Sequence, residues 1–218
     1  MLEFSLIMSI LLWIFAIIII WIVFVEVIIR ILRHYIHFPV PVFIGRFIDN
    51  PIRRRIQSPS KVVGWIDIKN GMLALEIGPG PGTFTIEAAK RAGSNGRIVA
   101  IDIEPIMIFK LRDKLRRNNI FNVEPIVGSA LDLPFRERVF DRVFMVAVFG
   151  ELPNKEKALL EIKRVIKDEG LLAIGEFLPD PDCPRRKTVI KWCAKTGFRL
   201  VNKYGHLLHY LLIFRKKL

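Results

Sequence analysis

Residues 76–84 read EIGPGPGTF, with three glycines and two prolines placed between a short, mostly apolar run and a helical pattern. The run, residues 72–77, predicts a β-strand, and residues 83–92 predict a helix that ends at Gly93. Glycines at such a turn let a ligand approach the backbone, and open α/β sheets bind ligands beyond the carboxyl ends of their strands. The stretch therefore predicts an α/β fold with a nucleotide-like ligand at this turn.

The same turn is poorly suited to a pyrophosphate. A dinucleotide-binding fingerprint has glycine or alanine five positions after its first glycine, where this sequence has Thr83. Pro79 and Pro81 remove two N–H donors from the turn, and the charge of Glu76 would repel a phosphate. A ligand with an adenosine and no phosphate fits better. S-adenosylmethionine is such a ligand, with a sulfonium, an ammonium and a carboxylate group.

Short apolar runs alternate with helical periodicity after this turn, which is typical of a parallel α/β sheet. Asn154 is placed to cap one helix and Gly170 to end it, and Gly205 predicts a hairpin turn between the last two strands. The last strand should therefore run antiparallel to the others. Further strands are predicted at residues 97–103, 123–127, 140–146, 171–176, 198–204 and 207–215, and further helices at 105–119, 154–170 and 188–196.

The glycine-rich stretch resembles the first motif of class I S-adenosylmethionine-dependent methyltransferases, and the resemblance continues over about residues 60–216. In that family an acidic residue at the end of the second strand contacts the ribose hydroxyls, and Asp102 matches it. A carboxylate there is able to accept two hydroxyl hydrogen bonds. The resemblance implies S-adenosylmethionine as the cofactor, and as its binding residues Glu76, Gly78, Gly80, Gly82, Asp102, Ile103, Ser129, Ala130 and Leu131.

The segment after the third strand departs from the family pattern. The family's Gly-Asp-Ala segment after the third strand, where the aspartate often meets the adenine amino group, appears here as Gly128-Ser129-Ala130. Ser129 replaces the acid, so the backbone of Ala130 and Leu131 is expected to border the adenine instead.

Residues 145–153, MVAVFGELP, follow the fourth predicted strand, where the family builds its acceptor pocket. The Asn-or-Asp-Pro-Pro-aromatic signature of enzymes that methylate nucleobase amines is missing, which argues against DNA and amino-group RNA targets. Methyl transfer requires positioning and exclusion of water, and a base is optional. Glu151 is the candidate to steer or deprotonate an acceptor, with an exposed residue before a helix as the alternative reading. Solvent exposure on an edge strand is expected for Tyr204, His206, His209 and Tyr210, with a position facing the acceptor as the alternative.

Residues 6–25 form an apolar segment with no charge and with Ser9 as its one polar side chain. A helix of this length spans about 30 Å, the thickness of the hydrocarbon core of a bilayer. A cleaved signal peptide would have a basic start and a shorter apolar run, whereas Glu3 precedes this segment and Glu26 follows it. A buried core helix would be shorter and more varied, and an interfacial helix would show a polar face. We therefore predict a transmembrane anchor within residues 1–30.

The predicted fold class is α/β, a Rossmann-like seven-stranded sheet with its last strand antiparallel, preceded by one N-terminal transmembrane helix. Three parts are expected: the anchor in residues 1–30, a membrane-surface elbow with lead-in helices in residues 31–70, and a methyltransferase domain in residues 71–218. The elbow is rich in aromatic and basic side chains, which suit the headgroup layer. His34 and His37 lie three positions apart without further ligands, so no metal site is expected.

The formal net charge of +13 lies in the flanks of the chain. Residues 1–70 hold 8 basic and 4 acidic side chains, residues 71–179 hold 16 and 15, and residues 180–218 hold 10 and 2. A nucleic-acid-binding protein would more often spread such charge over its core domain, so no nucleic-acid partner is expected and an anionic membrane surface is favoured. No Lys or Arg precedes the anchor and several arginines follow it, which predicts a single-pass cell-membrane protein with a cytoplasmic catalytic domain.

The leading functional hypothesis is a membrane-anchored methyltransferase, resembling membrane-associated lipid or quinone-type methyltransferases. Its acceptor would be a lipid-phase molecule, either an aminophospholipid or an isoprenoid or quinone lipid, because a soluble acceptor gives no reason for an anchor and two basic flanks. Two alternatives remain open. One is methylation of a membrane protein or a small molecule, and the other is a non-catalytic, membrane-tethered module that binds S-adenosylmethionine.

Overall fold

The structure is a computed structural model that describes residues 8–9, 12–21, 24, 28, 55–178, 182–206 and 208–217. The chain divides into two compact units, Met1–Pro39 and Val40–Leu218. The described residues of the first unit are helical. No helix among the residues that the structure describes is both long enough and apolar enough to span a membrane. Residues 31–54 of the predicted elbow, and much of the predicted anchor in residues 1–30, lie outside the described residues, and both stay predictions.

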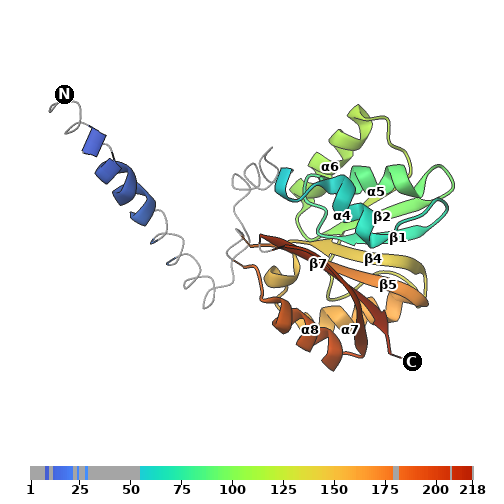
Figure 1. Ribbon diagram of the computed structural model, residues 1–218. Coiled ribbons are helices and arrows are strands. Elements are labelled where there is room, and N and C mark those ends of the chain that lie inside the picture. Colours follow the sequence, from blue (N-terminus) through green and yellow to red (C-terminus); the bar gives the residue numbers. More distant parts are fainter. Residues whose placement is uncertain are drawn as a thin grey trace. The chain divides into compact units, whose positions relative to one another are not determined.

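The second unit contains a seven-stranded sheet with the strand order β3-β2-β1-β4-β5-β7-β6 (Figure 1). The pairs from β3 to β5 are parallel, whereas β7 is antiparallel to both of its neighbours, β5 and β6. The predicted seven-stranded sheet with an antiparallel last strand is therefore confirmed. The strands are β1 (Leu73–Ile77), β2 (Arg97–Asp102), β3 (Val123–Val127), β4 (Phe140–Val146), β5 (Ile166–Phe177), β6 (Phe198–Gly205) and β7 (His209–Lys216).

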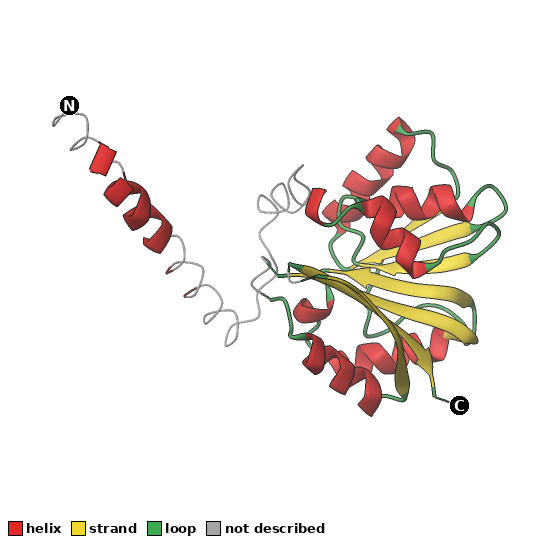
Figure 2. Ribbon diagram, in the orientation of Figure 1, coloured by secondary structure: helices red, strands yellow, loops and turns green. Residues whose placement is uncertain are grey.

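Helices cover both faces of the sheet, with α4, α5 and α6 on one face and α7 and α8 on the other (Figure 2). Because strand side chains alternate between faces, Leu75 and Ile77 of β1 join the core beneath α7 and α8, while Ala74 joins the core beneath α4 and α5. The helices are α4 (Pro59–Ile66), α5 (Thr85–Ala92), α6 (Pro105–Arg117), α7 (Lys155–Val165) and α8 (Arg186–Lys195), with a short 3-10 helix, η1 (Phe149–Glu151).

The junction of α7 and β5 differs from the prediction. Asn154 caps α7 as predicted, accepting a hydrogen bond from the Lys157 backbone N at 2.9 Å. The helix ends at Val165, however, and not at Gly170, because Ile166 already pairs with Phe140 of β4. The pairing then shifts register before Leu171. The fifth strand is therefore longer than the predicted residues 171–176.

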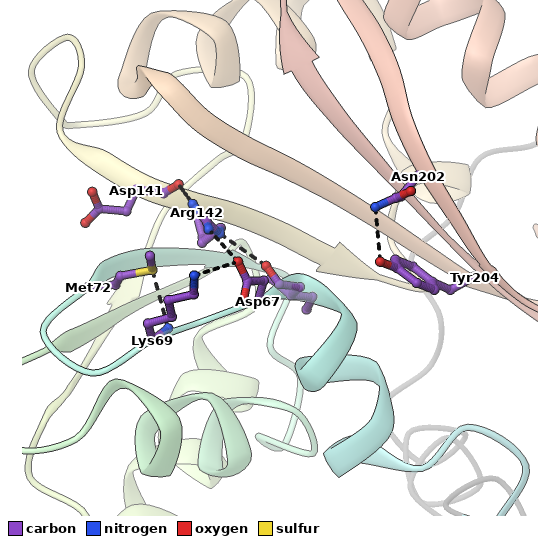
Figure 3. A network of polar contacts seen from close by, with 8 residues as sticks. Asp67, Lys69, Met72, Asp141, Arg142, Asn202 and Tyr204 are labelled. Atoms are coloured by element: carbon purple, nitrogen blue, oxygen red, sulfur yellow. Dashed lines mark hydrogen bonds and ion pairs between the residues drawn. The ribbon is translucent and has the colours of Figure 1, made fainter.

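A buried arginine joins α4 to the sheet (Figure 3). Arg142 on β4 donates from Nε to the Ile66 carbonyl and from Nη2 to Asp67 Oδ2, both at 3.2 Å. On the face of α4 toward the sheet, Val62, Val63 and Ile66 are buried. Helix α4 thus contributes to the core of the second unit although it precedes the glycine-rich stretch.

Candidate functional site

The three glycines of residues 76–84 all adopt left-handed backbone conformations, which disfavour larger side chains. Their φ angles are +67° at Gly78, +52° at Gly80 and +83° at Gly82. A Cβ at Gly78 would collide with Val148, and one at Gly82 would lie 2.5 Å from Leu111 Cδ1. A Cβ at Gly80 meets no described atom within 4 Å, so the loop presents open space at Gly80.

Asp102 lies at the end of β2, beside this glycine loop. Its Oδ2 accepts a hydrogen bond from the Gly80 backbone N at 3.2 Å, and its Oδ1 accepts one from the Glu104 backbone N at 3.0 Å. Burial raises the pKa of Asp102, while its backbone hydrogen bonds, those from Glu104 and Gly80 included, oppose the rise. These hydrogen bonds hold the Asp102 carboxylate next to the open space at Gly80.

Glu76 is a buried acidic side chain at the candidate site. It lies on β1 with 2% of its surface exposed, and its Oε2 has no hydrogen-bond partner among the described residues. Burial raises the pKa of Glu76 to about 8; the charge of Asp102 adds to the rise, while Thr85 and Lys114 oppose it. A buried carboxyl oxygen without a partner costs free energy, so a donor or cation supplied by a ligand would stabilise it.

The segment after β3 lies beside Asp102, because β3 is the neighbour of β2. The Gly128 backbone N donates to the Asp102 carbonyl at 2.9 Å. The Ser129 hydroxyl accepts a hydrogen bond from the Leu131 backbone N at 3.1 Å, so it is engaged within its own turn. Ile103, by contrast, exposes 68% of its surface at the end of β2.

The structure therefore brings the predicted cofactor residues together at the carboxyl ends of three adjacent strands. Glu76 lies near the end of β1 and the glycine loop follows it, Asp102 ends β2 and Ile103 follows it, and residues 128–131 follow β3. This is the edge at which parallel α/β sheets bind ligands. The contact of each residue with a cofactor remains a prediction.

The loop after β4, residues 147–152, is held by a buried carboxylate. Ala147 has a left-handed φ of +58°, and its backbone N donates to the Gly175 carbonyl at 2.8 Å. Glu176, 1% exposed at the end of β5, accepts a hydrogen bond from the Phe149 backbone N at 3.1 Å. The sequence reasoning missed Glu176, although an acidic residue near the end of a buried apolar strand is a signal that singles it out.

Lys155 and Glu151 complete the surroundings of this loop. Lys155 Nζ donates to the Gly150 and Leu152 carbonyls at 3.2 and 2.9 Å. Burial lowers the pKa of Lys155, and the charges of Asp182 and Glu176 oppose the fall. Glu151 is exposed at the end of η1, and its role toward an acceptor stays a prediction.

Two residues of the final hairpin are more buried than residues of an edge strand usually are. The edge strand is β6, whereas β7 lies between β5 and β6, so His209 and Tyr210 are buried. The Tyr210 hydroxyl donates to the Pro184 carbonyl at 2.6 Å, and burial raises the pKa of Tyr210. Burial lowers the pKa of His209, whose ring stacks on Trp65 with centroids 5.8 Å apart. Solvent exposure on an edge strand is therefore the wrong explanation for His209 and Tyr210.

Within the described part of the chain, no group of three or more His, Cys, Asp or Glu side chains could hold a metal ion. His34 and His37 lie outside the described residues.

Comparison with known proteins identifies the family. A methyltransferase-domain family model matches residues 68–211. A solved S-adenosylmethionine-dependent methyltransferase from Aquifex aeolicus has a TM-score of 0.76 at 25% identity, and the match covers 81% of this chain and 98% of that one. The chain belongs to this methyltransferase family, in the class I S-adenosylmethionine-dependent superfamily, and its cofactor is S-adenosylmethionine.

Its curated relatives include ubiquinone/menaquinone biosynthesis C-methyltransferases. The protein of that name from Idiomarina loihiensis is 36% identical over 111 residues, which is 50% of this chain and 44% of the relative. The one from Klebsiella pneumoniae strain MGH 78578 is 33% identical over 145 residues, which is 64% of this chain and 55% of the relative. The chain thus spans about half the length of the curated relatives it matches.

Proposed function

We propose that this protein transfers a methyl group from S-adenosylmethionine to a ring carbon of a quinone-type lipid. The observation that carries the choice of acceptor is the similarity to the ubiquinone/menaquinone biosynthesis C-methyltransferases at 33–37% identity. The apolar segment in residues 6–25 and the basic flanks support a lipid-phase acceptor. We also propose that residues 1–30 anchor the protein in the cell membrane, that residues 31–70 form the elbow, and that residues 71–218 form the cytoplasmic methyltransferase domain.

The residues present fit the cofactor. The open space at Gly80 admits a ligand to the backbone, and Asp102 beside it would accept the ribose hydroxyls. The unpartnered oxygen of Glu76 suits the positively charged part of the cofactor. When bound, the cofactor supplies an electrophilic methyl group on a sulfonium.

The protein's own part in the reaction is to position the acceptor and exclude water. The loop after β4 contacts the glycine loop directly, because Val148 packs against Gly78. A hydroquinone carbon becomes nucleophilic when its neighbouring hydroxyl loses a proton, and Glu151 is the candidate to take that proton. Glu176 sets the geometry of this loop through Phe149.

The test is incubation of the full-length protein with methyl-labelled S-adenosylmethionine and vesicles that contain a hydroquinone lipid with an unmethylated ring position. We expect label to enter the organic extract with the quinone. Label that stays with protein after extraction would overturn the lipid acceptor and favour a membrane-protein substrate. Cofactor binding by calorimetry with no labelled product from any membrane extract would favour a non-catalytic module.

The Asp102→Ala variant should bind S-adenosylmethionine about 5- to 150-fold more weakly. Two hydrogen bonds to a charged carboxylate would be lost, at about 1 to 3 kcal/mol in total. Calorimetric titration measures the effect, and Asp113→Ala is the matched control. Asp113 is a partly exposed acid on α6 that pairs with Arg117 at 2.8 Å. Equal affinity in the wild type and Asp102→Ala would exclude the ribose contact.

A further inference from the structure

Exposed apolar side chains gather at the carboxyl edge of the sheet, the same edge that carries the glycine loop. Helix α6 begins just after the end of β2, and its first turns expose Ile106 (44%) and Phe109 (67%). Strand β7 runs antiparallel, so it starts at this edge, and Leu208 just before it is 38% exposed. These side chains flank the candidate site on both sides.

The same edge carries positive charge on the first turn of α8. Arg185, Arg186 and Lys187 are exposed, and the first turn of α8 contains no acidic residue. Arg186 Nη2 donates to the His206 carbonyl in the final hairpin, which places this turn next to Leu208. Neither Arg185 nor Lys187 forms an ion pair within the described residues. Cations at a helix N-terminus are also disfavoured by the helix dipole, so an anionic partner would relieve this arrangement.

The opposite edge of the sheet is also basic, and three of its cations form ion pairs. Asp168 pairs with Arg138 at 3.4 Å and with Lys216 at 3.1 Å, and Glu169 pairs with Arg215 at 3.7 Å. At the site's own edge, cations without an ion pair among the described residues lie beside several exposed apolar side chains. Apolar side chains that enter a bilayer, flanked by cations that meet anionic headgroups, are the pattern of a membrane-surface contact.

We propose that Ile106, Phe109, Leu208 and residues 185–187, which we call the docking edge, seat the catalytic unit on an anionic bilayer. This inference rests on the proposed lipid acceptor, and it adds the route by which that acceptor arrives. The carboxyl edge of the sheet, which carries the candidate site, then faces the lipid, so the quinone ring enters without crossing water. The anchor holds the protein at the membrane, whereas the docking edge sets the orientation of the domain.

The test compares two full-length double variants with the same chemical changes at opposite edges. Phe109→Glu with Lys187→Glu alters the docking edge, and Phe121→Glu with Lys217→Glu is the matched control. Phe121 is 87% exposed before β3, and Lys217 is exposed after β7. Each protein is assayed with a long-tailed hydroquinone in vesicles of phosphatidylcholine and phosphatidylglycerol, and with the same headgroup without its tail in water.

We expect the docking-edge variant to lose about tenfold in kcat/KM with the vesicle acceptor and to match the wild type with the soluble one. The control variant should match the wild type with both acceptors. Equal losses with both acceptors, or no loss with either, would overturn the docking edge.

A second measurement tests the docking edge independently of the identity of the acceptor. An environment-sensitive fluorophore is attached in a Cys183→Ser background to Phe109→Cys or to Phe121→Cys. On addition of the same vesicles, emission should shift to the blue at position 109 and stay unchanged at position 121. Equal shifts at both positions, or none at 109, would overturn the docking edge even if quinone methylation is confirmed. A shift at 109 alone would support it even if the acceptor proves to be another lipid.

Discussion

Replacing Glu176 with alanine should lower kcat by about 100-fold. The Phe149 backbone N would lose its buried acceptor, and residues 147–152 would lose one of the hydrogen bonds that hold them in place. A displacement of about 1 Å at a reacting centre is enough for a loss of this size. The unpaired N–H should also lower the free energy of unfolding by about 1 to 3 kcal/mol. Initial rates with the hydroquinone acceptor and denaturant titration measure the two effects.

The Glu176→Gln variant distinguishes positioning from a general loss of stability. Its side-chain amide oxygen is still able to accept from Phe149, so kcat should recover to within about tenfold of the wild type. Glu156→Ala is the control, because Glu156 forms an exposed ion pair with Lys195 at 2.8 Å and such pairs contribute at most about 1 kcal/mol. A glutamine variant as slow as the alanine variant would show that the charge of Glu176, and not its hydrogen bond, is what matters.

The affinity for S-adenosylmethionine should rise about tenfold between pH 6 and pH 7. Glu76 has a pKa of about 8 in the cofactor-free protein, so it is mostly protonated in this range. A cation bound beside it favours the carboxylate, so binding releases a proton and strengthens by about a factor of ten per pH unit below the pKa. Calorimetry in two buffers of different ionisation enthalpy measures the proton directly.

The Glu76→Gln variant should show neither the proton release nor the pH slope. Its amide is uncharged at every pH and nearly the same size as the carboxylic acid. Proton release that persists in this variant would assign the titration to another group. The range stops at pH 7 because a free α-amino group, such as that of the cofactor, titrates near pH 8.

The same carboxyl group affects the stability of the cofactor-free protein. The folded pKa of Glu76 lies above its ordinary value of 4.5, so its contribution to stability is complete below pH 4.5 and is lost as the pH rises toward 8. Glu76→Gln should therefore be more stable than the wild type by on the order of 3 kcal/mol at pH 7, with the difference shrinking at pH 5. Denaturant titration at both pH values provides the comparison.

The order of the elements was predictable because each strand and helix is specified by local patterns. Val123–Val127 lies between Asn122 and Gly128, and Phe140–Val146 is a short, mostly apolar run. The structure has both strands at the predicted positions. The end of α7 was not predictable in this way. Ile166 continues the helical periodicity, and only its pairing with Phe140, a contact distant in sequence, makes it a strand residue.

The candidate site likewise has a part that local sequence patterns predict and a part that they do not. Glycine spacing and the acid at the end of β2 predicted residues that the structure brings together at one edge of the sheet, because those positions are set by local backbone geometry. Glu176 and the burial of His209 and Tyr210 depend on β7 lying between β5 and β6. That strand order is set by packing across the sheet, so a reading along the chain placed the hairpin at an edge.

The contact between Gly78 and Val148 constrains how this sequence can diverge. A larger residue at position 78 would need a smaller one at position 148, since a Cβ there collides with the valine side chain. The left-handed backbone at position 78 would still oppose the exchange. A steric clash and an unfavourable backbone conformation thus both oppose the replacement of Gly78. Position 80, with open space around its Cα, is protected only by its backbone conformation and by whatever ligand fills that space.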